Sequence, residues 1–157
     1  MGGRRTDQQG LALLGVLLLA AVVGLATLKV TEVWTVKLQR EREAELLAVG
    51  AEMRAAIASY MRNTPGGPPT LPTSLDDLLL DPRHPNPVRH LRRIYTDPFT
   101  GQPDWVLVRV GPGIMGLHSR ADVVPLKRHG FASWAAGFGS ARWVSDWRFT
   151  VEASAAR

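Results

Sequence analysis

Basic side chains are concentrated in the proline-rich segment 82–98, where guanidinium groups could bind phosphate or an acidic partner. The candidate basic surface consists of Arg83, Arg89, Arg92 and Arg93. The alternative is a solvated loop whose arginines pair locally with Asp76, Asp77 or Asp81. Because adjacent arginines do not by themselves make a binding site, both interpretations stay open.

Catalytic chemistry finds little support among the other polar residues. The histidines have no metal-ligand spacing such as H-E-x-x-H, and His118-Ser119 lacks a G-x-S-x-G context. The chain has no cysteine, which excludes thiolate zinc sites, cysteine nucleophiles and disulfides. We therefore expect a protein that is not an enzyme.

An uncharged run near the start of the chain determines how these residues are presented. Residues 11–28 carry no charge, and they follow a leader, 1–10, that contains Arg4 and Arg5. Eighteen residues form about 27 Å of helix, close to the roughly 30 Å hydrocarbon core of a bilayer. The positive-inside rule places the leader in the cytoplasm. The sequence therefore predicts one membrane-spanning half-helix over 11–30, with the rest of the chain outside.

The helical pattern continues beyond the uncharged run. Apolar residues then recur at steps of three and four, at Leu46, Val49, Met53, Ile57 and Tyr60. The helix should end near Asn63, before a proline- and glycine-rich segment. This pattern predicts an amphipathic half-helix over 31–63. A secretory signal peptide cleaved after Gly24-Leu25-Ala26 would explain only the first half.

Residues 64–157 are expected to form the remainder of a head with mixed secondary structure. Ser74 or Thr73 should cap a short helix over 74–81, which Pro82 closes. The predicted later elements are a strand over 105–110, a turn at 111–113, a strand over 114–119, a loop with a flexible end over 132–140, and a strand over 142–151. The expected fold is α+β, with a long N-terminal helix packed on a small antiparallel sheet of about three strands.

The order of leader, glycine, apolar helix, amphipathic continuation, loop and sheet resembles type IV pilin-like proteins. The closest resemblance is to the major pseudopilin of type II secretion systems. The matching residues are Gly10-Leu11 with the uncharged 12–14, Leu71-Pro72 with 75–80, and Tyr95 with 97–101 ahead of Trp105. The resemblance implies a pilin-like fold, cleavage between Gly10 and Leu11 by prepilin peptidase, and methylation. It also implies assembly through the N-terminal helix, with Leu11, Leu14, Gly15 and Gly24 as candidate assembly residues.

The resemblance further implies a structural subunit for protein secretion. One span would anchor it in the bacterial inner membrane, with the C-terminal domain in the periplasm. Its partners would be other pilin-like subunits, prepilin peptidase and the inner-membrane assembly platform. Two alternatives are a minor type IV pilin that binds DNA through 83–93, and a bitopic periplasmic binding or enzyme domain with a simple anchor. Nucleic acid is not the expected partner, because the net charge of +5 is small and dispersed.

One position departs from the family pattern. Pilin-like proteins usually carry a glutamate at the fifth residue after the cut, and this chain has Gly15 there. In the family this carboxylate pairs with the terminal amine of a neighbouring subunit, which a charge inside lipid requires. Gly15 therefore indicates a subunit at a filament tip or a divergent branch that assembles differently.

Major pseudopilins bind calcium in the loop before their last strands, so the resemblance also implies a candidate metal site. The available carboxylates are Asp97, Asp104, Asp122 and Asp146. Calcium prefers several oxygen ligands, often from one loop. These four are scattered without D-x-D spacing, and the alternative is that they are surface and turn aspartates. Calcium is the one cofactor that the resemblance implies.

Overall fold

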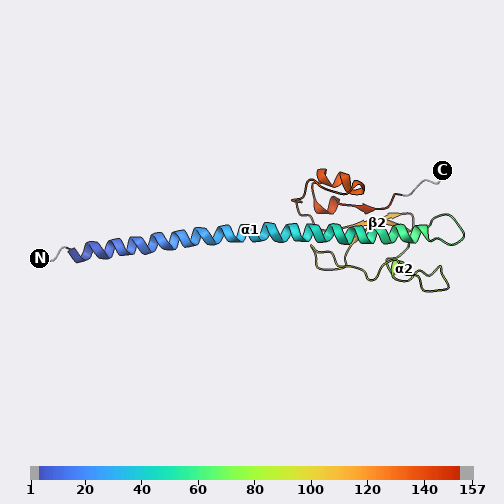
Figure 1. Ribbon diagram of the computed structural model, residues 1–157, viewed down its shortest axis with the longest axis horizontal. Coiled ribbons are helices and arrows are strands. Elements are labelled where there is room, and N and C mark those ends of the chain that lie inside the picture. The colour runs from blue at the N-terminus through green and yellow to red at the C-terminus, as the bar shows by residue number, and fades with distance from the viewer. Residues whose placement is uncertain (1–3, 153–157) are drawn as a thin grey trace. The chain divides into compact units, whose positions relative to one another are not determined.

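The computed structural model describes residues 4–152, and within α1 it describes the side chains of 13–22 and 34–62. The elements are α1 (Arg4–Arg62), α2 (Asp76–Leu79), β1 (Val106–Val110), β2 (Gly113–His118), the 3-10 helices η1 (Ser133–Ser140) and η2 (Val144–Asp146), and β3 (Phe149–Thr150) (Figure 1). The chain divides into two compact units, Met1–Gln39 and Arg40–Arg157, and we call the second the head unit. The predicted α+β class, with a long helix and a three-stranded antiparallel sheet, is confirmed.

Helix α1 ends at Arg62, within one residue of the predicted position. The backbone N–H and the side-chain amide of Asn63 both donate to the carbonyl of Ser59, at 3.1 and 2.9 Å. The hydroxyl of Thr64 donates to the carbonyl of Met61 at 2.9 Å. These bonds satisfy carbonyls of the last turn, and Pro65 prevents a further turn. The helix begins at Arg4 rather than at the predicted Leu11.

One face of α1 forms a wall of the hydrophobic core of the head unit. Its buried positions recur at steps of three and four, at Glu43, Leu46, Gly50, Met53, Ile57 and Tyr60. The buried apolar residues that complete this core are Leu78, Leu91, Trp105, Ile114, Leu117, Ala135, Phe138, Ala141, Val144, Trp147, Phe149 and Val151, together with Ala56 of α1. The periodicity of the sequence therefore predicted the correct face of the helix.

The sheet has the order β1-β2-β3, and both pairs are antiparallel. Strands β1 and β2 are joined by a tight turn in which Gly111 has a φ of 57°, a value that favours glycine. A β-bulge interrupts the β1–β2 register between Val108 and Arg109. At Gly116 a Cβ would lie 2.5 Å from the carbonyl oxygen of Phe149, so the close approach of β3 requires glycine.

The last predicted strand, 142–151, is wrong over most of its length. Only Phe149–Thr150 is strand, because η2 (Val144–Asp146) turns the chain before it. The N–H groups of Val144 and Ser145 donate to carbonyls of the preceding loop, at 2.8 and 3.1 Å, instead of to a neighbouring strand. Strand composition was present, but the backbone donors are used elsewhere.

The segment predicted to end a flexible loop, 132–140, contains η1 instead. Phe138 is buried there, and its ring is stacked on Trp147 with centroids 5.7 Å apart and an interplanar angle of 5°. Glycines gave this segment the composition of a loop. At Gly139, however, a Cβ would lie 2.5 Å from the carbonyl oxygen of Arg128, so glycine serves close packing here.

The short helix predicted over 74–81 is also shorter than expected. Helix α2 covers Asp76–Leu79, and Leu80 already has an extended backbone with φ −150° and ψ 107°. The next N–H, that of Asp81, donates to the carbonyl of Val88 at 2.9 Å. Ser74 does contribute at the start, since its hydroxyl accepts the N–H of Asp76 at 3.1 Å. The predicted helix therefore exists as a single turn.

Gly50 offers a direct test of how α1 packs on the sheet. A Cβ at this position would collide with the buried ring of Phe149. Gly50→Ala should therefore destabilise the head unit by roughly 1–3 kcal/mol, although alanine normally favours a helix. Urea unfolding of the full chain in a neutral detergent, followed by tryptophan fluorescence, measures the change. Gly67→Ala is the control, because a Cβ there meets nothing within 4 Å, and an equal loss in both variants would contradict this packing.

Candidate functional site

The predicted processing and assembly residues lie in α1. Gly10, Leu11 and Gly24 fall within its bounds, but their surroundings lie outside the described residues. Leu14 is 65% exposed. A Cβ at Gly15 would meet nothing within 4 Å, so neither residue is used in packing within its own chain.

Every residue from 13 to 22 is exposed, on all sides of the helix. The large apolar side chains among them are 56–69% exposed: Leu13, Leu14, Val16, Leu17, Leu18, Leu19 and Val22. Burying such a side chain fully is worth roughly 1.5–3 kcal/mol. The seven together represent roughly 10–20 kcal/mol of burial that their own chain does not use. A helix that is apolar all round is typical of segments surrounded by lipid or by other helices.

The predicted span over 11–30 is described only in part. Its residues 11–12 and 23–30 lie outside the described residues. Within the side chains that are described, 13–22 and 34–152, no helix is both long and apolar enough to cross a bilayer.

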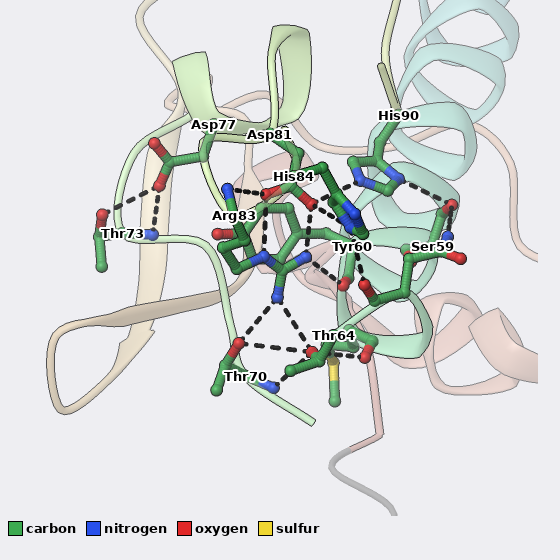
Figure 2. Close-up of polar contacts among 12 residues, drawn as sticks. Ser59, Tyr60, Thr64, Thr70, Thr73, Asp77, Asp81, Arg83, His84 and His90 are labelled. Carbon is green, nitrogen blue, oxygen red and sulfur yellow. Dashed lines mark hydrogen bonds and ion pairs between the residues drawn. The ribbon is translucent and has the colours of Figure 1, made fainter. Parts of the chain in front are cut away.

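In the head unit, the first of the predicted basic residues lies in a buried polar network with Asp81 (Figure 2). Asp81 is 1% exposed, and its carboxylate accepts hydrogen bonds from Nε and Nη2 of Arg83, at 2.9 and 2.6 Å. The guanidinium also donates to the carbonyl of Tyr60 at 2.7 Å and lies 3.4 Å from the centroid of its ring. Hydroxyls of Thr64 and Thr70 accept its remaining bonds, at 2.9 and 2.8 Å. Arg83 therefore holds its own loop against α1.

This pairing shifts the pKa values of both partners. The side-chain hydrogen bond from Arg83 holds the pKa of Asp81 well below its usual range, against the opposing effect of burial. The same bond raises the pKa of Arg83. Burial raises the pKa of Tyr60, against the effect of the neighbouring guanidinium. The pair is therefore ionised over the whole physiological range.

A serine, a histidine and the same aspartate lie in one chain of hydrogen bonds. The hydroxyl of Ser59 lies 2.9 Å from Nδ1 of His90, and Nε2 of His90 lies 3.2 Å from Oδ2 of Asp81 (Figure 2). A hydrolytic triad uses the opposite ring nitrogens, with Nδ1 toward aspartate and Nε2 toward serine. The imidazole is also 1% exposed, which leaves little access for a substrate. This arrangement instead connects the loop to α1.

The other three predicted basic residues remain on the surface. Arg89, Arg92 and Arg93 are exposed, and the guanidinium of Arg93 lies 5.0 Å from the centroid of the Tyr95 ring. Tyr95 in turn donates to Glu52 of α1 at 2.6 Å, which raises the pKa of the phenol. The four arginines are therefore not one surface, because Arg83 points inward and pairs with Asp81, as the local-pairing alternative requires.

The four candidate calcium ligands are used in separate local structures. Asp97 is buried and accepts hydrogen bonds from the N–H of Phe99 at 2.9 Å and the hydroxyl of Ser119 at 2.6 Å. Asp104 accepts from Thr100 at 2.5 Å, Asp122 from Ser145 at 2.9 Å, and Asp146 from the N–H groups of Arg142 and Trp143 at 3.1 and 2.8 Å. Over residues 4–152, no three acidic or histidine side chains are grouped so that they could hold a metal ion.

Comparison with known proteins leaves the chain without an assigned relative. No family model, curated protein or solved structure matches it. The residues that sequence reasoning missed are therefore identified from the geometry alone. They are His90 and Ser59, whose positions on one polar network have no local sequence signal. The neighbouring pair Asp81 and Arg83, two residues apart, was the only part of this network that the sequence indicated.

The buried pair predicts a specific dependence of stability on pH. Asp81→Asn leaves the buried guanidinium of Arg83 without its carboxylate, so the free energy of unfolding should fall by roughly 3 kcal/mol at neutral pH. Because the folded-state pKa of Asp81 is depressed, its contribution is present above the usual aspartate pKa of about 4 and is lost as pH falls toward the folded value. Urea unfolding of the full chain at several pH values measures this. The gap between the two proteins should narrow below about pH 4.

The matched control for this prediction is Asp76→Asn, which removes an exposed carboxylate from the same region. A surface change of this kind should alter stability by less than about 0.5 kcal/mol. A gap for Asp81→Asn that is equally large in acid and at neutral pH would show that the charge of Asp81 is not what stabilises the loop.

Proposed function

We propose that this chain is a structural pilin-like subunit of the pseudopilin kind, from a type II secretion system or a related type IV filament machinery. It is anchored in the bacterial inner membrane and assembled through its N-terminal helix, with the head in the periplasm. Its partners are prepilin peptidase, the inner-membrane assembly platform and other pilin-like subunits. The cut falls between Gly10 and Leu11, and methylation follows.

The observation that carries this proposal is the double character of α1. Residues 13–22 expose apolar side chains on all sides, while the buried face from Leu46 to Tyr60 belongs to the core of the head unit. A helix of this kind supplies an apolar surface for lipid or for neighbouring helices, together with a head built on the same element. A simple anchor requires no such face in the core, which disfavours the bitopic alternative.

Gly15 supports a specific version of this proposal. A Cβ at this position meets nothing within 4 Å, so the surroundings in the chain itself do not require glycine. The absence of the family glutamate therefore reflects the assembly rather than the fold of the subunit. This supports a position at a filament tip, or a branch in which the terminal amine of a neighbour finds another partner.

Processing gives the first test. Co-expression of the full chain with a prepilin peptidase should remove residues 1–10 and leave Leu11 as the new N-terminus, as measured by intact-protein mass spectrometry of the membrane fraction. Gly10→Val should remain full length, because a branched side chain replaces the glycine at the cut. An intact Met1 in the wild type would contradict the proposal. A new N-terminus at Thr27 would instead indicate a signal peptide.

Assembly gives the second test. Gly15→Glu should increase co-purification with pilin-like subunits of a host secretion system, because the added carboxylate can pair with the terminal amine of a neighbouring helix. The helix accommodates the new side chain, since nothing lies within 4 Å of its Cβ. Gly15→Gln is the matched control, with a similar size and no charge. Equal incorporation of wild type, Gly15→Gln and Gly15→Glu would show that this position has no role in assembly.

A further inference from the structure

A cavity of about 370 Å³ opens in the head unit beside the first turns of its α1 segment. Its walls are Arg40, Glu43 and Ala44 of α1, and residues 126–129 of the loop that follows β2. All of these residues belong to the head unit. The volume lies in the range of about 300–1,000 Å³ that is typical of small-molecule sites.

The loop side of this cavity is held in place by buried contacts. Glu43 is 1% exposed, and its two carboxylate oxygens accept the N–H groups of Leu126 and Lys127, at 2.7 and 2.9 Å. One nitrogen of the Arg128 guanidinium donates to the carbonyl of Ala141 at 2.7 Å. Hydrogen bonds to an ionised carboxylate are among the stronger ones in proteins. The backbone that carries the lining side chains is therefore fixed to α1 before any ligand arrives.

The charges around the cavity favour an anion. Arg40, Lys127 and Arg128 contribute three cationic side chains, and His129 adds an imidazole, whereas Glu43 is the one carboxylate of the lining. The cations come from two separate elements, the helix and the loop. A phosphate group offers acceptor oxygens in several directions and suits such an arrangement better than a carboxylate, which offers two oxygens in one plane. The cavity is also larger than a bare phosphate ion needs.

We propose that this cavity is a binding site for a phosphate ester of about the size of glycerol phosphate. This chemistry is shared by the headgroups of anionic phospholipids and by small soluble phosphates. The inference does not depend on the pilin-like assignment, because it uses only residues of the head unit.

The test uses the full chain in an uncharged detergent. Dihexanoylphosphatidylglycerol, glycerol 3-phosphate and zwitterionic dihexanoylphosphatidylcholine are titrated separately, and isothermal calorimetry measures each affinity. The phosphatidylglycerol, the glycerol phosphate or both should bind saturably at one site per chain. Arg40→Gln and Lys127→Gln should each weaken that binding about tenfold, the effect of losing one charged hydrogen bond.

Arg42→Gln provides the matched control. Arg42 is an exposed arginine of the same helix that does not line the cavity, because two residues correspond to a rotation of about 200°. It should change the affinity less than twofold, and circular dichroism should show all three variants folded. Tighter binding of the lipid would assign the site to a membrane headgroup, and equal or tighter binding of glycerol 3-phosphate to a soluble ester.

Three results would overturn the proposal. One is the absence of saturable binding by either anionic ligand. The second is equal binding of the phosphatidylcholine, because a compensated phosphate should be rejected. The third is an equal loss in Arg42→Gln and Arg40→Gln, which would indicate non-specific attraction to basic side chains. None of these results affects the processing test, which depends on residues 1–11.

Discussion

The head unit depends on the burial of one face of α1. Its sheet has three strands, and β3 contains only two residues, so the sheet is too small to be stable without a helix packed on it. The helix accommodates this sheet through Gly50, where the ring of Phe149 occupies the space that a side chain would take. Aromatic side chains then fill the remaining volume, with Trp147 and Phe149 both fully buried. The long helix is therefore a structural part of the head as well as an extension from it.

A second requirement follows from the irregular chain between α1 and β1. Apart from the single turn of α2, residues 63–105 contain no helix or strand, so their backbone cannot rely on regular hydrogen bonds. The buried Asp81 supplies the missing order by accepting bonds from Arg83 and His90, which in turn reach Tyr60 and Ser59 of α1. A buried ion pair is a costly way to fix a loop unless its other bonds are satisfied. Here the hydroxyls and carbonyls at the end of α1 satisfy them.

Local patterns predicted the parts of the fold that depend on local interactions. Apolar spacing identified the core face of α1, and Pro65 identified its end, because both signals act within a few residues. The last strand was overestimated because Val144 and Ser145 spend their N–H groups on a distant loop, which strand composition does not reveal. The contacts of Glu43 with Leu126 and Lys127 join residues 83 and 84 positions apart, and no short motif encodes them.

The candidate site followed the same division. Arginines were visible in the sequence, but their roles depend on the nearest buried carboxylate. Arg83 has Asp81 two residues away and turns inward, whereas Arg89 and Arg92 are exposed. The proposed membrane helix and its cleavage site could be predicted from composition alone, because lipid selects for apolar character rather than for precise contacts.

Glu43 links the packing of α1 to the proposed phosphate site. The buried face runs at steps of three and four from Tyr60 back to Leu46, and the next position in this series is Glu43 instead of an apolar residue. An apolar side chain there would pack against other side chains and close the space beside it. A carboxylate requires hydrogen-bond donors, so the helix meets the backbone of 126–127 at this point. A backbone strand fills less volume than a cluster of side chains, and the cavity lies where the core ends for this reason.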